Sequence, residues 1–187
     1  MTHLPEANPA LFAKEIIKAA LEYRTMPEAP DEEFYRNPSA CFVSIKKEGE
    51  LRGCIGTLEP AEADLGLEIT RNAQSAAFGD PRFPAVVAEE LDRLRFSVDV
   101  LSVPQGVAGP EALDCSQYGV IVSCEYRRGV LLPALEGVES VENQLSIACQ
   151  KAGISPSEEF AIERFTVSRF DEDWKPGDEP GGGSCST

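Results

Sequence analysis

Residues 41–56 read CFVSIKKEGELRGCIG, two apolar segments separated by the charged tetrapeptide KEGE. In the first segment Cys41, Val43 and Ile45 alternate with Phe42 and Ser44, which is the two-residue period of a strand. The tetrapeptide contains a glycine that can take a positive φ angle, as a tight hairpin turn requires. Residues 51–58 then predict a second strand, so the segment as a whole predicts an antiparallel hairpin.

Helical patterns lie on both sides of this hairpin. Asn8 followed by Pro9 is typical of a helix start, and apolar residues at helical spacing continue the helix to Leu21. The alanine-rich residues 62–78 predict a second helix, with Gly79 placed at its C-terminal end.

The second half of the chain repeats the element order of the first. The order is strand, turn, strand, helix, glycine, strand, first in residues 41–47, 47–50, 51–58, 62–78, Gly79 and 94–103, then in residues 120–124, 126–129, 130–132, 140–152, Gly153 and 162–170. The two final strands also carry similar text, RFSV at residues 95–98 and RFTV at residues 164–167. This pattern predicts an internal duplication.

The predicted fold class is α+β, with antiparallel sheets, helices packed between or against them, and two strand-strand-helix-strand pseudo-repeats. We expect one domain over residues 8–170, with repeat halves at about residues 40–103 and 118–170. Residues 171–187 are acidic and glycine-rich, and we expect a flexible tail there.

Composition limits the class of function. The chain has 187 residues and a net charge of −15, and its basic residues are scattered among acidic ones, which argues against nucleic-acid binding. No run of 18 apolar residues and no signal-peptide pattern is present, so we expect a cytoplasmic protein without a membrane span. The six cysteines are then expected to be reduced thiols.

The residue types that are missing narrow the chemistry further. The one histidine is His3, near the N-terminus, which disfavours the usual Ser/His and Cys/His forms of catalysis. There is no C-x-x-C pair and no glycine-rich phosphate loop, so we expect neither a metal nor a cofactor.

The segment LRGCIG, residues 51–56, is the strongest candidate site. In a regular strand Arg52, Cys54 and Gly56 share one face, and an arginine beside a thiol favours the nucleophilic thiolate. Gly53 and Gly56 within one strand indicate a bulge or the close approach of another backbone. The competing interpretation is that Cys54 only packs in the core.

A stiff loop, DPRFP at residues 80–84, is the second candidate. Its two prolines restrict the backbone, so Asp80 and Arg82 are expected in fixed positions, either for function or as an internal salt bridge. Ser97 gains interest only if its strand face borders Cys54. The neighbouring pair Glu89 and Glu90 is interpreted as a solvated helix end rather than as general acid/base carboxylates.

These motifs together resemble the AMMECR domain family. The resemblance rests, in family order, on CFVSI (41–45), LRGCIGT (51–57), DPRFP (80–84), FSV (96–98), LLP (131–133) and KAG (151–153), and covers about residues 10–170. It implies an α+β fold with two related substructures and a shared surface around Arg52, Gly53 and Cys54. The bacterial single-domain form resembles a component of the AmmeMemoRadiSam set, and this resemblance implies two companions, a Memo-like protein and a radical S-adenosylmethionine protein. No reaction comes with the resemblance.

Two functions therefore remain open. The first is a non-catalytic partner subunit that docks a companion through the Arg52-Gly53-Cys54 surface and the loop at residues 80–84. The second is an enzyme or ligand-binding protein that uses Cys54 as nucleophile or ligand group, with Arg52 and Asp80 assisting and Gly53, Gly56, Arg82 and Ser97 contributing to binding.

Overall fold

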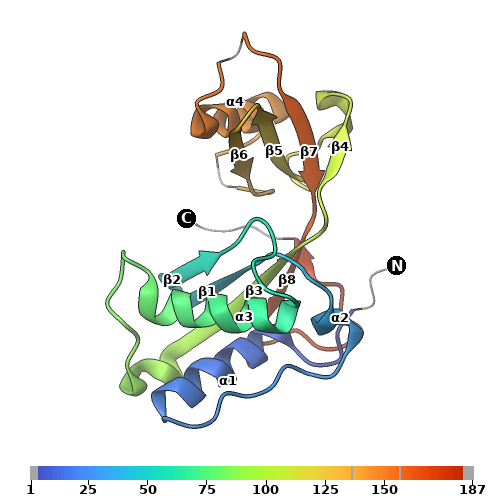
Figure 1. The fold of residues 1–187 in the computed structure, drawn as a ribbon. Helices are drawn as coiled ribbons and strands as arrows, with labels where there is room; N and C mark the ends of the chain where they lie inside the picture. Colours follow the sequence, from blue (N-terminus) through green and yellow to red (C-terminus); the bar gives the residue numbers. More distant parts are fainter. Residues whose placement is uncertain (1–3, 136, 156, 183–187) are drawn as a thin grey trace. The chain divides into compact units, whose positions relative to one another are not determined.

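The computed structural model describes residues 4–182 except residues 136 and 156, and it divides into two compact units. Of the described residues, the first unit contains those up to Val100 together with Arg169–Gly181, and the second contains Leu101–Ser168 and Gly182. Each unit combines a sheet with helices, so the predicted α+β class is confirmed (Figure 1).

The first unit is built around a five-stranded sheet with the strand order β2-β1-β3-β8-β9. Its elements are α1 (Pro9–Leu21), α2 (Glu33–Arg36), β1 (Cys41–Lys47), β2 (Glu50–Gly56), α3 (Leu65–Gln74), a π-helical turn (Ser75–Gly79), a 3-10 helix (Ala88–Arg93), β3 (Leu94–Leu101), β8 (Val167–Asp171) and β9 (Gly181–Gly182). Helices α1 and α3 cover one face of this sheet (Figure 1).

The predicted hairpin is formed by β1 and β2, which pair antiparallel. Glu48 and Gly49 both have positive φ angles, 55° and 92°, as a two-residue type I′ turn requires. The register shifts between Ile45 and Lys46, and Arg52 is the extra residue on β2. The bulge predicted from the two glycines is therefore present.

Apolar side chains between the sheet and the helices form the core of the first unit. The side chains from the first sheet and helices include Ile16, Ile17, Cys41, Val43, Ile45, Ile69, Ala73, Phe96 and Val98, and Phe170 and Trp174 join the same cluster from the C-terminal segment. Asn8 caps α1 as predicted, since its side chain accepts hydrogen bonds from the N–H groups of Ala10 and Leu11. Leu11, one of the apolar residues whose helical spacing predicts this helix, is exposed.

The helix predicted at residues 62–78 is shorter at its start and changes type at its end. It begins at Leu65, where the Asp64 side chain accepts a hydrogen bond from the N–H of Leu67, and it becomes a π-helical turn after Gln74. Gly79 ends that turn without a positive φ angle. Asp80 follows this turn directly and lies at the edge of the sheet, beside β2.

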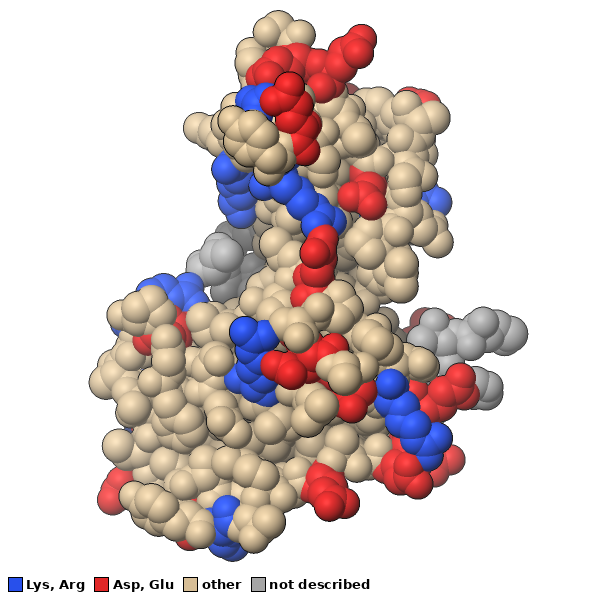
Figure 2. Space-filling view, in the orientation of Figure 1, with Lys and Arg blue, Asp and Glu red and all other residues tan. Residues whose placement is uncertain are grey.

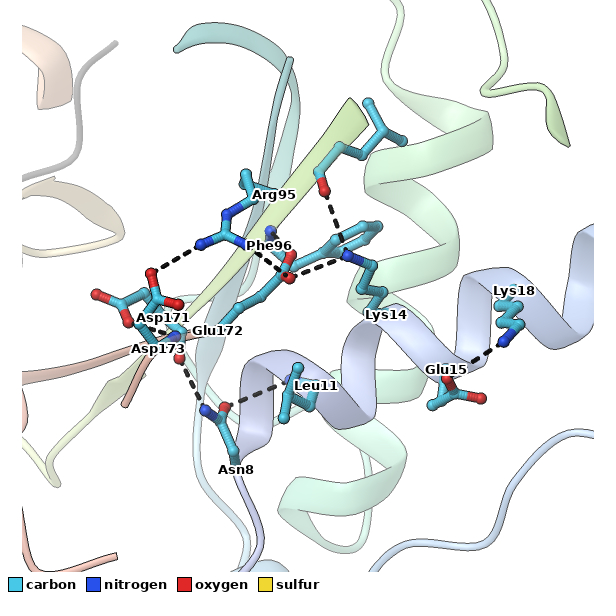
Figure 3. A network of polar contacts seen from close by, with 11 residues as sticks. Asn8, Leu11, Lys14, Glu15, Lys18, Arg95, Phe96, Asp171, Glu172 and Asp173 are labelled. Atoms are coloured by element: carbon cyan, nitrogen blue, oxygen red, sulfur yellow. Dashed lines mark hydrogen bonds and ion pairs between the residues drawn. The ribbon is translucent and has the colours of Figure 1, made fainter. Parts of the chain in front are cut away.

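A polar network ties the C-terminal segment to the first unit (Figure 3). The Glu172 carboxylate accepts hydrogen bonds from Lys14 Nζ at 2.9 Å and from the N–H of Phe96 at 2.8 Å. The Asn8 side chain donates to the carbonyls of Asp171 and Trp174. The first residues of the predicted tail are thus packed, while residues 183–187 lie outside the described residues.

The second unit has a four-stranded sheet with the order β4-β7-β5-β6. Its elements are β4 (Gln105–Val107), a 3-10 helix (Pro110–Ala112), β5 (Gly119–Cys124), β6 (Arg127–Leu131), α4 (Val141–Ala152) and β7 (Ala161–Phe165). Helix α4 begins after Ser140, which caps it, and ends at Gly153 with a positive φ of 66°, as predicted. It packs against β5 and β6.

The prediction of a single strand at residues 162–170 is wrong. The chain forms two strands there, β7 and β8, which belong to different sheets and are separated at Thr166. The similar text around Phe96 and Phe165 is also out of register. Phe96 of β3 pairs with Ile45 of β1. In the second unit the equivalent pair is Ile162 of β7 with Val122 of β5, so Phe96 corresponds in position to Ile162 and not to Phe165.

The two hairpins nevertheless share one detail that local propensity does not require. A Cβ atom on Gly53 of β2 would lie 2.2 Å from the carbonyl oxygen of Ala76, and one on Gly129 of β6 would lie 2.0 Å from that of Ala148. In both units a glycine of the edge strand thus lets the following helix approach the sheet. This match fixes the equivalence of the two halves at Gly53 and Gly129.

Candidate functional site

Cys54 lies on edge strand β2, on the face of the sheet opposite to Gly53 and the helices. Its side chain is half-buried, and Ser44 Oγ of β1 donates a hydrogen bond to Cys54 Sγ at 3.2 Å. Ser44 pairs on its other side with Ser97 of β3. Cys54, Ser44 and Ser97 therefore form one row across three strands, and Ser97 lies on the Cys54 face.

The Arg52 side chain binds away from the thiol, to Glu90. Arg52 Nη2 donates to Glu90 Oε1 at 2.7 Å, Arg52 Nε donates to Glu90 Oε2 at 3.4 Å, and Arg52 Nη1 donates to the Pro84 carbonyl at 2.9 Å. Only 12% of the side chain is exposed. Because the bulge adds Arg52 without a partner on β1, the alternation that predicts a shared face with Cys54 is interrupted there.

Glu90 was interpreted from the sequence as part of a solvated helix end, and the structure shows it buried. Besides Arg52, it accepts hydrogen bonds from Lys47 Nζ at 2.8 Å and from the N–H of Val87 at 3.3 Å. Burial acts to raise the pKa of Glu90, but the hydrogen bonds from Lys47 and Arg52 outweigh it and lower the pKa to about 2.

Asp80 and Arg82 cover the open edge of β2. The N–H of Cys54 donates to Asp80 Oδ2 at 3.0 Å, and Arg82 Nη2 donates to the Cys54 carbonyl at 3.1 Å. Arg82 also donates to both Asp80 oxygens, Nε to Oδ1 at 3.0 Å and Nη2 to Oδ2 at 2.9 Å. The ion pair thus supplies the acceptor and donor that a neighbouring strand would offer.

These contacts keep Asp80 ionised. Hydrogen bonds from the Arg82 side chain, helped by those from the N–H groups of Cys54 and Arg82, hold the pKa of Asp80 well below its usual range. Only 2% of the Asp80 side chain is exposed.

Gly56 has a different role from Gly53. A Cβ atom on Gly56 would lie 2.3 Å from the ring of Phe42 and 2.6 Å from the Cys41 carbonyl oxygen. The Phe42 ring therefore packs over Gly56, which is a common way to cover a glycine near a sheet edge.

Residues 78–87, which run from the end of the π-helical turn to the start of the 3-10 helix, are mostly apolar and mostly exposed. Phe78 is 38% exposed and Val87 51% exposed, and Pro81, Pro84 and Ala85 are exposed as well. The segment is fixed by buried groups between these side chains, because Asp80 binds β2 and the N–H of Val86 donates to the Ala77 carbonyl at 2.8 Å.

The second unit shows which of these features belong to the architecture. There Arg127 of β6 binds Glu158 in the helix-to-strand connection, as Arg52 binds Glu90, and Gly129 matches Gly53. By register, however, Val130 and Ile121 stand where the first unit has Cys54 and Ser44. The helix-facing glycine is thus repeated in register. An arginine–glutamate pair recurs out of register, because Arg127 lies two residues before Gly129 whereas Arg52 lies one residue before Gly53. The Ser44–Cys54 pair has no counterpart at the equivalent positions of the second unit.

Two classes of site are not found in the described part of the chain. No group of three or more His, Cys, Asp or Glu side chains there is placed to hold a metal ion. No helix among the described residues is long and apolar enough to cross a membrane. On the face in Figure 2, most lysine and arginine side chains lie beside acidic ones. His3 and Cys185 lie outside the described residues.

Comparison with known proteins agrees with this architecture. A protein of Thermotoga maritima is 48% identical over 145 residues, which cover 76% of this chain and 83% of that protein. A protein of Clostridium acetobutylicum is 48% identical over 147 residues, and the match covers 79% of this chain and 31% of the longer relative. The crystal structure of an uncharacterized protein from Pyrococcus horikoshii has a TM-score of 0.75 and 27% identity, covering 93% of this chain and 95% of that one. The AMMECR1 family profile matches residues 10–172, and this chain belongs to the AMMECR1 family.

Proposed function

We propose that this AMMECR1-family chain is a non-catalytic partner subunit that docks a companion protein through residues 78–87. One observation carries the proposal. The side chains of Arg52 and Asp80, the two residues predicted from the sequence to assist Cys54, both hold residues 78–87 against β2. The Arg-Gly-Cys segment thus supports an exposed loop instead of assembling an acid/base site.

The chemistry of Asp80 argues against proton transfer there. An efficient general base has a pKa near the working pH, whereas the pKa of Asp80 is held far lower. Its oxygens are also occupied by Cys54 N–H and by Arg82. Arg52 is likewise bound to Glu90.

Residues 78–87 have the properties of a preformed interface. Several exposed apolar side chains within one short segment favour protein binding, and a backbone that is already fixed loses little conformational entropy when it binds. The two prolines and the buried Asp80 provide that rigidity. Arg82 is the one exposed charge in the segment, with half of its side chain exposed.

The companions that we propose are the Memo-like protein and the radical S-adenosylmethionine protein of the AmmeMemoRadiSam set. The Clostridium acetobutylicum relative supports a role beside another module, because its matching segment forms 31% of a longer chain.

Co-purification of the full chain with each companion tests the proposal. We expect Phe78→Asp and Val87→Asp to abolish the complex, because each places a charge in the apolar interface. The matched control is Leu11→Asp on α1, at a leucine that is 45% exposed, and it should leave the complex intact. A complex that survives both loop variants would show that docking occurs elsewhere.

A second function, thiol chemistry or ligand binding at Cys54, is supported by the Ser44 hydrogen bond. A hydroxyl that donates to sulfur stabilises the thiolate, and the row of Cys54, Ser44 and Ser97 offers a thiol and two hydroxyls on one face. Alkylation of Cys54 in the folded chain across pH 6–10 tests this. A Cys54 that stays unreactive at every pH rules the second function out.

A further inference from the structure

We infer that Glu90 is the positioning residue of the docking surface: it fixes Arg52, and Arg52 fixes residues 78–87. The expected effect of Glu90 on docking rests on the proposed function, whereas the contacts by which Glu90 holds Arg52 do not. Glu90 itself is buried and is not expected to touch the partner.

Glu90 joins three parts of the first unit. Its carboxylate accepts hydrogen bonds from Lys47 at the end of β1, from Arg52 on β2 and from the N–H of Val87. Val87 is also more exposed than Phe78, at 51% against 38%. One carboxylate thus links the hairpin to the C-terminal end of the proposed surface.

The link through Arg52 reaches the middle of the segment. Glu90 binds Nε and Nη2 of the guanidinium, which orients Nη1 and Nη2 toward the carbonyls of Pro84 and Ala85, at 2.9 and 3.4 Å. A planar guanidinium held by two points on a carboxylate has one orientation. Without the carboxylate, Arg52 has no fixed direction and the two carbonyls lose a fixed donor.

The charges explain why a glutamate is needed. Lys47 and Arg52 bring two cations to Glu90, and the Arg52 side chain is mostly buried. A neutral residue in place of Glu90 leaves two neighbouring cations without a counter-charge, so both are expected to turn toward solvent.

The second unit supplies a matched control within the same molecule. Glu158 binds Arg127, whose Nη1 donates to the Gly153 carbonyl at 2.8 Å, and Glu158 also accepts from the N–H of Ser155. The pair fixes the segment after α4 as Glu90 and Arg52 fix the segment after α3. Glu158→Gln therefore removes an ion pair of the same type, though a more exposed one, far along the sequence from residues 78–87.

The experiment combines hydrogen exchange with binding, using the full chain. Glu90→Gln is expected to raise amide exchange in residues 80–87 at least tenfold. It should also weaken binding at least tenfold to whichever companion, the Memo-like protein or the radical S-adenosylmethionine protein, co-purifies with the natural sequence. Glu158→Gln should raise exchange only around residues 153–158 and leave binding unchanged. Glu90→Asp keeps the charge with a shorter side chain, is expected to give intermediate values, and serves if Glu90→Gln does not fold.

The outcomes separate the two ideas. Unchanged exchange in residues 80–87 of Glu90→Gln overturns the positioning role, whatever happens to binding. Raised exchange with undiminished binding overturns the docking surface, and with it the role of Glu90 in docking. Equal loss of binding in Glu90→Gln and Glu158→Gln also overturns the inference, because it indicates a general loss of stability.

Discussion

The main-chain N–H of Cys54 donates a 3.0 Å hydrogen bond to Oδ2 of Asp80, a residue 26 positions further along the chain. Arg82 completes the contact from the same loop by donating to the Cys54 carbonyl. The sequence motif at residues 51–56 and the motif at residues 80–84 are thus parts of one structural unit, in which the loop closes the edge of the sheet.

Asp80→Asn tests the strength of this closure. The asparagine keeps an acceptor for the Cys54 N–H but loses the charge that binds Arg82, so we expect the free energy of unfolding to fall by about 1.5–3 kcal/mol at pH 7. Urea denaturation measures the change. The control is Asp31→Asn, because Asp31 binds Arg36 in a fully exposed pair whose loss should change stability little. Equal effects of the two substitutions would contradict the structural role of Asp80.

Acid should destabilise the fold through Glu90. Its pKa is lowered from 4.5 to about 2 on folding, so its contribution to stability is complete above pH 4.5 and is lost as the pH falls from 4.5 to 2. The full loss amounts to at most about 3 kcal/mol. Urea denaturation at several pH values should show a shallower acid slope for Glu90→Gln than for the natural sequence. An unchanged slope in that variant would show that Glu90 is not the responsible group.

Local signals in the sequence predicted much of the fold. The start of α1 at Asn8-Pro9, the turn at Gly49 and both ends of α4 depend on residues within one turn of the chain. Such signals survive in the folded protein because caps and tight turns are formed by neighbouring atoms. The element order and the internal repeat follow from them.

The candidate site was harder to predict because its contacts are long-range. Glu90 binds Arg52 across 38 positions and Lys47 across 43, and no local pattern distinguishes such a glutamate from a solvated one. The pairing of Ser44 with Cys54 could not be predicted because it depends on the bulge. A regular hairpin with the observed turn places Gly53 opposite Ser44, and the extra residue shifts the partner to Cys54.

The break at Thr166 shows a further limit. Residues 162–170 have continuous strand character, yet the chain changes sheets in their middle. There Thr166 accepts a hydrogen bond from the N–H of Ser102 and donates its own N–H to the Ser102 hydroxyl. A strand that changes partners keeps its local conformation, so its sequence pattern does not mark the change.

The paired glycines offer a test of the repeat. Gly53→Ala and Gly129→Ala each place a methyl group against a helix carbonyl at an impossible distance, so the helix must shift, and we expect each to lose about 1–3 kcal/mol of stability. Gly79→Ala and Gly106→Ala are the controls, since a Cβ there meets nothing within 4 Å. Chemical denaturation of the four variants gives the comparison. A Gly53→Ala variant as stable as the controls would refute the close approach of Ala76.

Thiol reactivity should rank the cysteines by their surroundings. Burial raises the pKa of Cys41 to about 12, although a hydrogen bond from Asn72 opposes the shift, and burial also raises the pKa of Cys149. Because the thiolate is the reacting form, alkylation of both at pH 8 should be at least about a hundredfold slower in the folded chain than in urea. Cys54 is half-buried beside Ser44, so it should react faster than Cys41. Peptide mass spectrometry after timed alkylation gives each rate, and Cys54→Ser identifies the peptide. Equal protection of Cys54 and Cys41 would mean that the Cys54 face is closed in solution, which would remove the thiol hypothesis and leave docking at residues 78–87 as the function to test.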